Sequence, residues 1–160
     1  MVFHPIEPVF NSESKILILG SFPSVKSREE NFYYAHPQNR FLKIISMIFD
    51  EELPITIDDK ISILLKNKIA LWDVINSCEI YRSSDSTIKN VVPNDISRII
   101  NSSKVNLVVL NGQTSGKYFQ RFFNKSLEIS SIILPSTSPA NASFSIDALY
   151  QNWKILKEYI

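Results

Sequence analysis

The chain has 160 residues, 44% hydrophobic and 21% charged, with a formal net charge of +1. This length and composition predict one globular domain over residues 1–160 and exclude a disordered chain or a membrane-spanning protein. The small net charge neither predicts nor excludes a nucleic-acid partner. Cys78 has no second cysteine to pair with, and the first ten residues lack a signal-peptide pattern. We therefore expect a cytoplasmic protein without a disulfide.

Strand-like and helix-like segments alternate along the chain. Short runs rich in Ile, Val and Leu predict buried parallel strands, whereas apolar residues three and four apart predict helices. Thr56 and Asp59 also form a capping box at one predicted helix start. In chain order, we predict a strand at 15–19, a helix from Phe41, a helix from Thr56, a strand at 69–75, a helix from Pro93, a strand at 105–110, a helix at 114–124, a strand at 129–134 and a helix at 145–158.

The alternation predicts an α/β fold, a three-layer α/β/α sandwich with a central four-stranded parallel sheet. In such folds ligands bind beyond the carboxyl ends of the strands. The segments that follow the predicted strands are all small and polar: residues 20–24, 76–78, 111–115 and 135–141. We expect the functional site at this edge, with Asp73 at the end of the second strand.

Several common chemistries lack the residues that they need. The three glycines, at positions 20, 112 and 116, cannot build a dinucleotide loop or a P-loop. Two histidines and one cysteine give no standard zinc spacing, so we expect neither a metal nor a cofactor. Gly20-Ser21 lacks the second glycine of a nucleophile elbow. A hydrolase with Ser21 as nucleophile and His36 as base stays open as an alternative.

Three sequence blocks carry a resemblance to a known family. They are Gly-Ser-Phe-Pro-Ser at residues 20–24, Tyr-Ala-His-Pro-Gln-Asn-Arg-Phe at 34–41 and Ser-Thr-Ser-Pro-Ala-Asn at 136–141. With Leu-Trp-Asp-Val-Ile at 71–75 and Pro-Asn-Asp at 93–95, the chain resembles the uracil-DNA glycosylase superfamily. It looks most like the deoxyinosine (hypoxanthine-DNA) glycosylase branch, which is related to the mismatch-specific uracil/thymine glycosylases.

One departure from the mismatch-specific enzymes affects the expected mechanism. Their first block has an asparagine that helps to position the attacking water, and this chain has Phe22 there. In the deoxyinosine branch the asparagine of the second block is implicated in catalysis, which corresponds to Asn39. From the residues alone, Asn39 is also a good helix N-cap before Arg40, and that alternative stays open.

The resemblance implies a role for each block. Tyr34 aligns with an aromatic residue that stacks on the extruded base, and Asp73 can accept a hydrogen bond from N1–H of hypoxanthine, although it can equally cap a turn. The loop at 136–141 corresponds to the segment that enters DNA at the flipped nucleotide. The expected roles are catalysis by Asn39, base binding by Gly20, Ser21, Phe22, Tyr34 and Asp73, and DNA binding by Ser24, Ser136, Thr137, Ser138, Pro139, Ala140 and Asn141.

The resemblance also implies the reaction. We expect a monofunctional DNA glycosylase, because no lysine stands in the blocks as a Schiff-base nucleophile. We also expect a monomer. Hypoxanthine is the expected base. A uracil or thymine mismatch glycosylase, and a base-binding domain of the same fold without activity, are the alternatives.

Overall fold

The computed structural model describes residues 1–160 and has two sheets. The four-stranded sheet has the order β3-β2-β6-β7, and every neighbouring pair in it is parallel. Its strands are β2 (Ile16–Gly20), β3 (Ile69–Asp73), β6 (Leu107–Asn111) and β7 (Ser130–Leu134). The predicted central sheet is confirmed. All residues of β2, β3 and β6 are buried, which explains their continuous rather than alternating apolar sequence.

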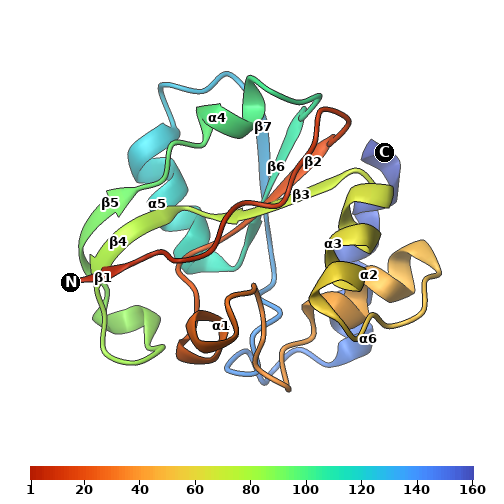
Figure 1. Ribbon diagram of the computed structural model, residues 1–160, viewed down its shortest axis with the longest axis horizontal. Coiled ribbons are helices and arrows are strands. Elements are labelled where there is room, and N and C mark those ends of the chain that lie inside the picture. The colour runs from red at the N-terminus through yellow and green to blue at the C-terminus, as the bar shows by residue number, and fades with distance from the viewer.

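Helices cover both faces of this sheet (Figure 1). On one face lie α2 (Phe41–Phe49), α3 (Ile57–Lys66) and α6 (Ile146–Trp153), and α5 (Gln113–Phe123) packs on the other. The helices predicted at these places are confirmed, including the cap of α3, where the Thr56 side chain accepts from the Asp59 N–H. No helix is long and apolar enough to cross a membrane. The remaining helical segments are α1 (Val25–Glu30), α4 (Ser97–Ile100), η1 (Asp85–Thr87) and η2 (Lys154–Tyr159).

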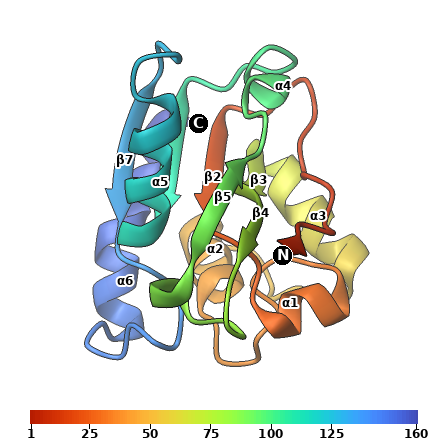
Figure 2. The same cartoon turned by 90° about the vertical axis from the view of Figure 1, so that its left-hand side faces the viewer.

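A second sheet, absent from the sequence prediction, lies beside the first (Figure 2). It has the order β1-β4-β5 and contains β1 (Val2–Phe3), β4 (Ile75–Glu79) and β5 (Lys89–Pro93). The predicted strand at 69–75 was therefore too long, because β3 ends at Asp73 and Ile75 already belongs to β4. The predicted loop at 76–78 is strand, and the helix expected from Pro93 begins at Ser97. Polar residues hide β4 in the sequence, since strands are normally poor in Asn and Ser-like turn formers.

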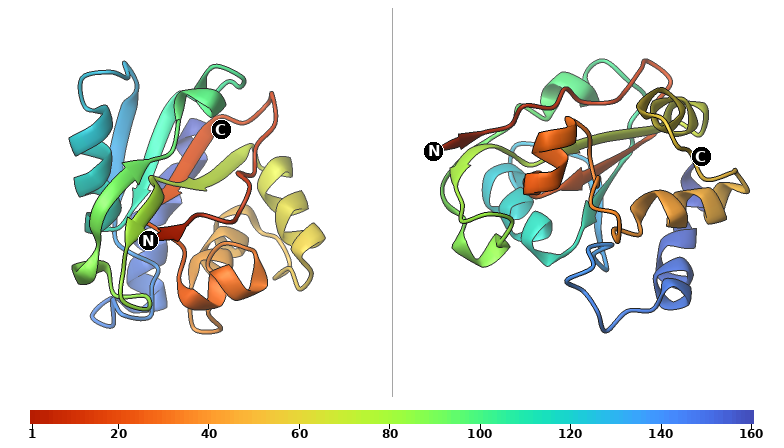
Figure 3. Two further views of the ribbon diagram at one scale, coloured as in Figure 1. Left: turned by 60° about the vertical axis from the view of Figure 1, so that its left-hand side comes forward. Right: turned by 60° about the horizontal axis from the view of Figure 1, so that its bottom comes forward.

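The N-terminal segment connects the two sheets. Val2 pairs with Cys78 of β4 in antiparallel register, and Val9 forms a bridge with Leu71 of β3. Figure 3 shows this segment running along β4 toward β3. The segment therefore places the residues between these two contacts, including His4, directly behind the carboxyl end of β3.

Candidate active site

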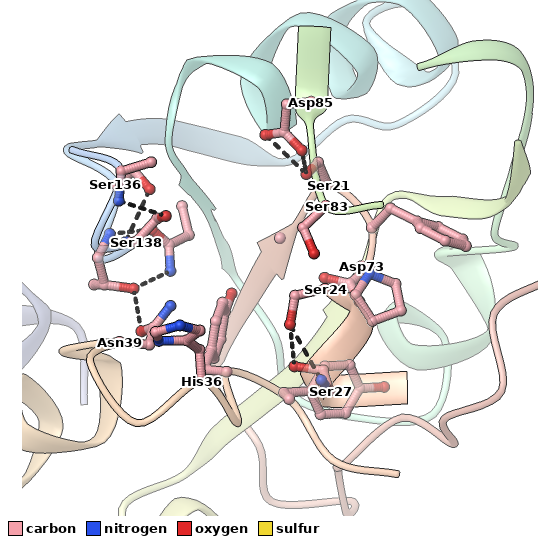
Figure 4. Close-up of a pocket in the computed structure, with 18 of the residues that line it drawn as sticks. Ser21, Ser24, Ser27, His36, Asn39, Asp73, Ser83, Asp85, Ser136 and Ser138 are labelled. Atoms are coloured by element: carbon pink, nitrogen blue, oxygen red, sulfur yellow. Dashed lines mark hydrogen bonds between the residues drawn. The ribbon is translucent and has the colours of Figure 1, made fainter. Parts of the chain in front are cut away.

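A cavity of about 440 Å³ opens at the carboxyl edge of the parallel sheet (Figure 4). Its walls are the loop after β2, the segment around Tyr34 and Asn39, the loop before β5, and the loop after β7. Asp73 and Asn111, the last residues of β3 and β6, form part of its floor. The volume is within the range of small-ligand sites, and the edge is the one expected for a parallel sheet.

Gly20 and Asp73 fit together at this floor. The two residues are partners in the β2–β3 register, and a Cβ atom on Gly20 would lie 2.3 Å from Asp73 Oδ1. No side chain fits in that space, so glycine is required for the Asp73 carboxylate to take its place. Asp73 is only 3% exposed.

His4 holds the other oxygen of this carboxylate. His4 Nε2 lies 2.7 Å from Asp73 Oδ2, and the Ile6 N–H donates to His4 Nδ1. Because Nδ1 accepts, the proton of the neutral ring is on Nε2, which donates to Asp73. Asp73 Oδ1 accepts no hydrogen bond from the protein. The expectation that Asp73 caps a turn is wrong, since its partner is a histidine 69 residues away.

Asn39 is fixed by two hydrogen bonds to its oxygen. Asn39 Oδ1 accepts from the Phe41 N–H at 2.9 Å and from Thr137 Oγ1 at 3.0 Å. A backbone N–H can only donate, so the atom facing Phe41 is the oxygen and the amide orientation is determined. Nδ2 makes no hydrogen bond within the protein. The alternative that Asn39 is the helix N-cap is wrong, because the N-cap of α2 is Arg40; Asn39 precedes it and binds the first N–H of the helix through Oδ1, while Nδ2 stays available at the cavity wall.

Thr137 supports Asn39 from the opposite loop. Its backbone N–H donates to Asn111 Oδ1, and Asn111 Nδ2 donates to Thr137 Oγ1, both at 3.0 Å. Thr137 has no exposed surface. The expectation that Thr137 contacts DNA is therefore corrected: its hydroxyl is buried and bridges Asn111 to Asn39.

Arg40 holds the loop after β7 in shape. Its guanidinium donates to the carbonyl oxygens of Ser138, Asn141 and Phe144. The backbone N–H of Arg40 donates to the Thr137 carbonyl. The side chain of Asn141 turns inward and donates to the Ser136 carbonyl. Residues 136–140 thereby line the cavity, whereas Asn141 stabilises the loop instead of lining it.

Tyr34 lies in the cavity wall in a strained conformation. Its φ is 53°, in the left-handed region that a bulky residue seldom adopts. Its ring packs on Phe41 with centroids 4.4 Å apart, and its hydroxyl is buried without a partner. Burial raises the pKa of Tyr34, so the hydroxyl stays protonated. Backbone strain with an unsatisfied polar atom is typical of a functional position. Its neighbour Tyr33 is a core residue whose hydroxyl donates to the Glu7 carbonyl.

The loop after β2 combines structural and exposed groups. Phe22 is buried at the cavity and makes an edge contact with the His4 ring. The Ser24 side chain caps α1 by accepting from the Ser27 N–H. His36 is exposed, and its Nδ1 accepts from the Gln38 N–H.

The segment between β4 and β5 supplies a wall that the sequence did not reveal. Ser83 Oγ accepts from the Val25 N–H, and the Arg82 carbonyl accepts from Arg28, so this segment is tied to α1. Ser21 Oγ donates to both oxygens of Asp85, at 3.3 and 3.4 Å. Asp85 is exposed to solvent, but the cavity walls remove part of its hydration and raise its pKa; the charge of Asp73 adds to this, while the nearby hydroxyls of Ser21 and Thr114 oppose it.

The structure brings most of the predicted site residues to one cavity. Only Asn141 is outside its lining. Sequence reasoning missed His4, Arg40, Asp85 and Asn111, which act through contacts between distant segments. Of these, only Asn111 had a signal, namely its place at the end of a predicted strand. The cavity contains Gly20, Ser21, Phe22, Ser24, Tyr34, Asn39, Asp73, Ser136, Thr137, Ser138, Pro139 and Ala140.

An aromatic wall, an amide donor and carboxylates at the open edge of a parallel α/β sheet are groups that can hold a flat, uncharged base by stacking and hydrogen bonding. A family model, the Uracil DNA glycosylase superfamily, matches residues 7–157. The chain belongs to the uracil-DNA glycosylase superfamily, as its sequence blocks predicted.

Named relatives agree with this family. The chain is 35% identical over 113 residues to a "Hypoxanthine DNA glycosylase" of Methanosarcina barkeri, covering 69% of this chain and 72% of the relative. It is 33% identical over 147 residues to a protein of the same name from Methanosarcina acetivorans, covering 91% and 92%. A solution NMR structure of a "putative Uracil DNA glycosylase" from Methanosarcina acetivorans matches with a TM-score of 0.81 and 30% identity, covering 98% of this chain and 96% of that one.

Proposed function

We propose that this DNA glycosylase excises hypoxanthine from DNA, acts as a monomer and leaves an abasic site without cutting the strand. The observation that carries the proposal is the Asp73 carboxylate, which His4 holds by one oxygen while the other is free. Two relatives carry the name hypoxanthine DNA glycosylase. A single chain supplies every wall of the cavity, which supports action as a monomer.

A free carboxylate oxygen can distinguish a deaminated base from its parent. Adenine has an acceptor at N1 and a donor at N6, whereas hypoxanthine has N1–H and the acceptor O6. An ionised carboxylate only accepts, so Asp73 Oδ1 pairs with N1–H and repels the lone pair of adenine N1. A site that hydrogen-bonds one partner strongly rejects an analogue that lacks it. Uracil also has an N–H beside a carbonyl, which makes it the runner-up base.

Asn39 acts on the leaving base. Since Oδ1 is occupied by Phe41 and Thr137, the group that Asn39 can offer is the Nδ2 donor. Negative charge accumulates on the base as the glycosidic bond breaks, and a fixed donor aimed at that charge lowers the barrier. Asn39 therefore stabilises the leaving group.

The test uses labelled duplexes that contain one inosine, one uracil or one G:T mismatch, followed by hot alkali. We expect breaks at inosine above all, and none before alkali. Preferred breaks at uracil or thymine would identify the mismatch-type enzyme, and no break at any lesion from folded protein would identify a binding module. In Asp73→Asn, the preference for inosine over uracil should change, and an unchanged preference would reject Asp73 as the residue that reads the base.

A further inference from the structure

Hydrolysis of the glycosidic bond needs an acceptor for a proton of the attacking water, and most acceptors in the cavity are already used. Asn39 Oδ1 accepts from Phe41 and Thr137. His36 Nδ1 accepts from the Gln38 N–H, so its other nitrogen is a donor. Phe22 has no polar side-chain atom. None of these side chains has a free acceptor for the water proton, although Asn39 Nδ2 can still donate to the water oxygen.

Two carboxylates remain in the cavity wall, and they are in different positions. Asp73 is buried at the floor and bound to His4. Asp85 lies on the other side of the opening from Asn39, on the segment between β4 and β5 (Figure 4). It forms no ion pair with any lysine or arginine; the Ser21 hydroxyl donates to it and the Thr114 hydroxyl lies near it.

An unpaired carboxylate at this place weakens the binding of DNA. The cavity belongs to a protein that binds a polyanion, so an acidic group at its mouth repels phosphates. A negative charge at this place can instead stabilise positive charge that develops during the reaction. The sugar becomes oxocarbenium-like, and therefore positively charged, during hydrolysis. The Ser21 hydroxyl donates to this carboxylate, which lies across the opening from Asn39 (Figure 4).

We infer that Asp85 is a catalytic residue that binds the attacking water and accepts its proton. This inference rests on the proposed glycosylase function. The water oxygen bonds to C1′ of the sugar while the bond from C1′ to the base nitrogen breaks. The electron pair of the broken bond leaves with the base. One water proton moves to the Asp85 carboxylate and the other stays on the new sugar hydroxyl. Asp85 then returns its proton to solvent, and the departing base takes one up from solvent.

The experiment measures single-turnover excision on the preferred duplex by wild type, Asp85→Asn and Asp85→Ala. General base catalysis contributes about 10²- to 10⁴-fold, so we expect losses of this size with duplex affinity unchanged or increased. Added formate should partly restore Asp85→Ala. Wild-type excision should rise with pH and level off once Asp85 is ionised, and Asp85→Asn should lack this rise. The groups that face Asp85 are Ser21, Thr114 and Asp73.

Glu29→Gln is the matched control, because Glu29 is an exposed carboxylate on α1 outside the cavity, and its removal changes the net charge equally. It should excise at the wild-type rate. Folding of each variant is checked by circular dichroism, and if Asp85→Ala unfolds, the isosteric Asp85→Asn decides. If Asp85→Asn excises within about threefold of wild type, far below the expected loss, the inference fails while the proposed function stands. If wild type excises no base at all, both fail.

Discussion

The oxygen and the nitrogen of the Asn39 side chain have different roles. The oxygen is bound within the protein, whereas the nitrogen is available to a substrate. Oδ1 closes the start of α2 and receives the Thr137 hydroxyl, whereas Nδ2 faces the cavity. The sequence allowed both the capping and the catalytic interpretation because Asn is favoured for each. The structure shows that the oxygen binds the first N–H of α2 from the position before the N-cap, Arg40, and that the nitrogen has no partner within the protein.

Asn39→Asp tests this division. An aspartate keeps an oxygen for Phe41 and Thr137 but replaces the cavity donor with a second acceptor. We expect excision to fall about 10²- to 10³-fold, the usual cost of removing one such donor. Thermal stability should stay close to wild type. Asn39→Ala loses both ends, so it should also lose about 1 kcal/mol of folding free energy for each of the two hydrogen bonds of Oδ1. Wild-type excision by Asn39→Asp would contradict the donor role.

At the scale of elements, the site depends on contacts between segments far apart in the chain. Continuous apolar runs made β2, β3 and β6 predictable, and the loops at their carboxyl ends located the cavity. The second sheet was not predictable in this way, because β4 is polar and β1 has two residues. His4 and Asp85 reach the site through this second sheet. Their roles come from tertiary pairing, which leaves no local pattern in the sequence.

The N-terminal segment contributes to the site through His4, and this can be tested on that segment alone. His4→Phe keeps a ring beside Phe22 and Tyr33 but removes the hydrogen bond to Asp73. Hydrogen bonds to charged groups contribute about 1.5 to 3 kcal/mol, so the free energy of unfolding should fall by that amount. Inosine excision should fall with it, because Asp73 is no longer held.

His4→Gln should restore both properties in part, since its amide nitrogen can donate to Asp73 from a similar distance along the side chain. Urea unfolding and single-turnover excision measure the two effects. Equal defects in His4→Phe and His4→Gln would show that ring packing, and not the hydrogen bond, is the contribution of His4.

At the scale of the whole molecule, the site lowers the stability of the fold. The α/β sandwich packs its core from Ile6 to Leu156, yet the cavity retains a strained Tyr34 with an unsatisfied hydroxyl and an unpaired Asp85. A fold selected for stability alone would replace such groups. Proteins commonly accept this cost where a reaction requires it.

Asp85 makes this cost measurable through pH. Its folded-state pKa is raised above the ordinary value of 3.8, so the unfolded chain holds the ionised form more easily. At a pH above the raised pKa, the ionised Asp85 therefore lowers the free energy of unfolding. This loss of stability disappears as the pH falls through the raised pKa toward 3.8, because the folded state takes up the proton at a higher pH than the unfolded state does. We expect Asp85→Asn to melt at a higher temperature than wild type near neutral pH, with the difference shrinking at acidic pH. Glu29→Gln, measured by the same circular dichroism scans, should show no such pattern. A lower melting temperature of Asp85→Asn at neutral pH would mean that Asp85 stabilises the fold through its contact with Ser21.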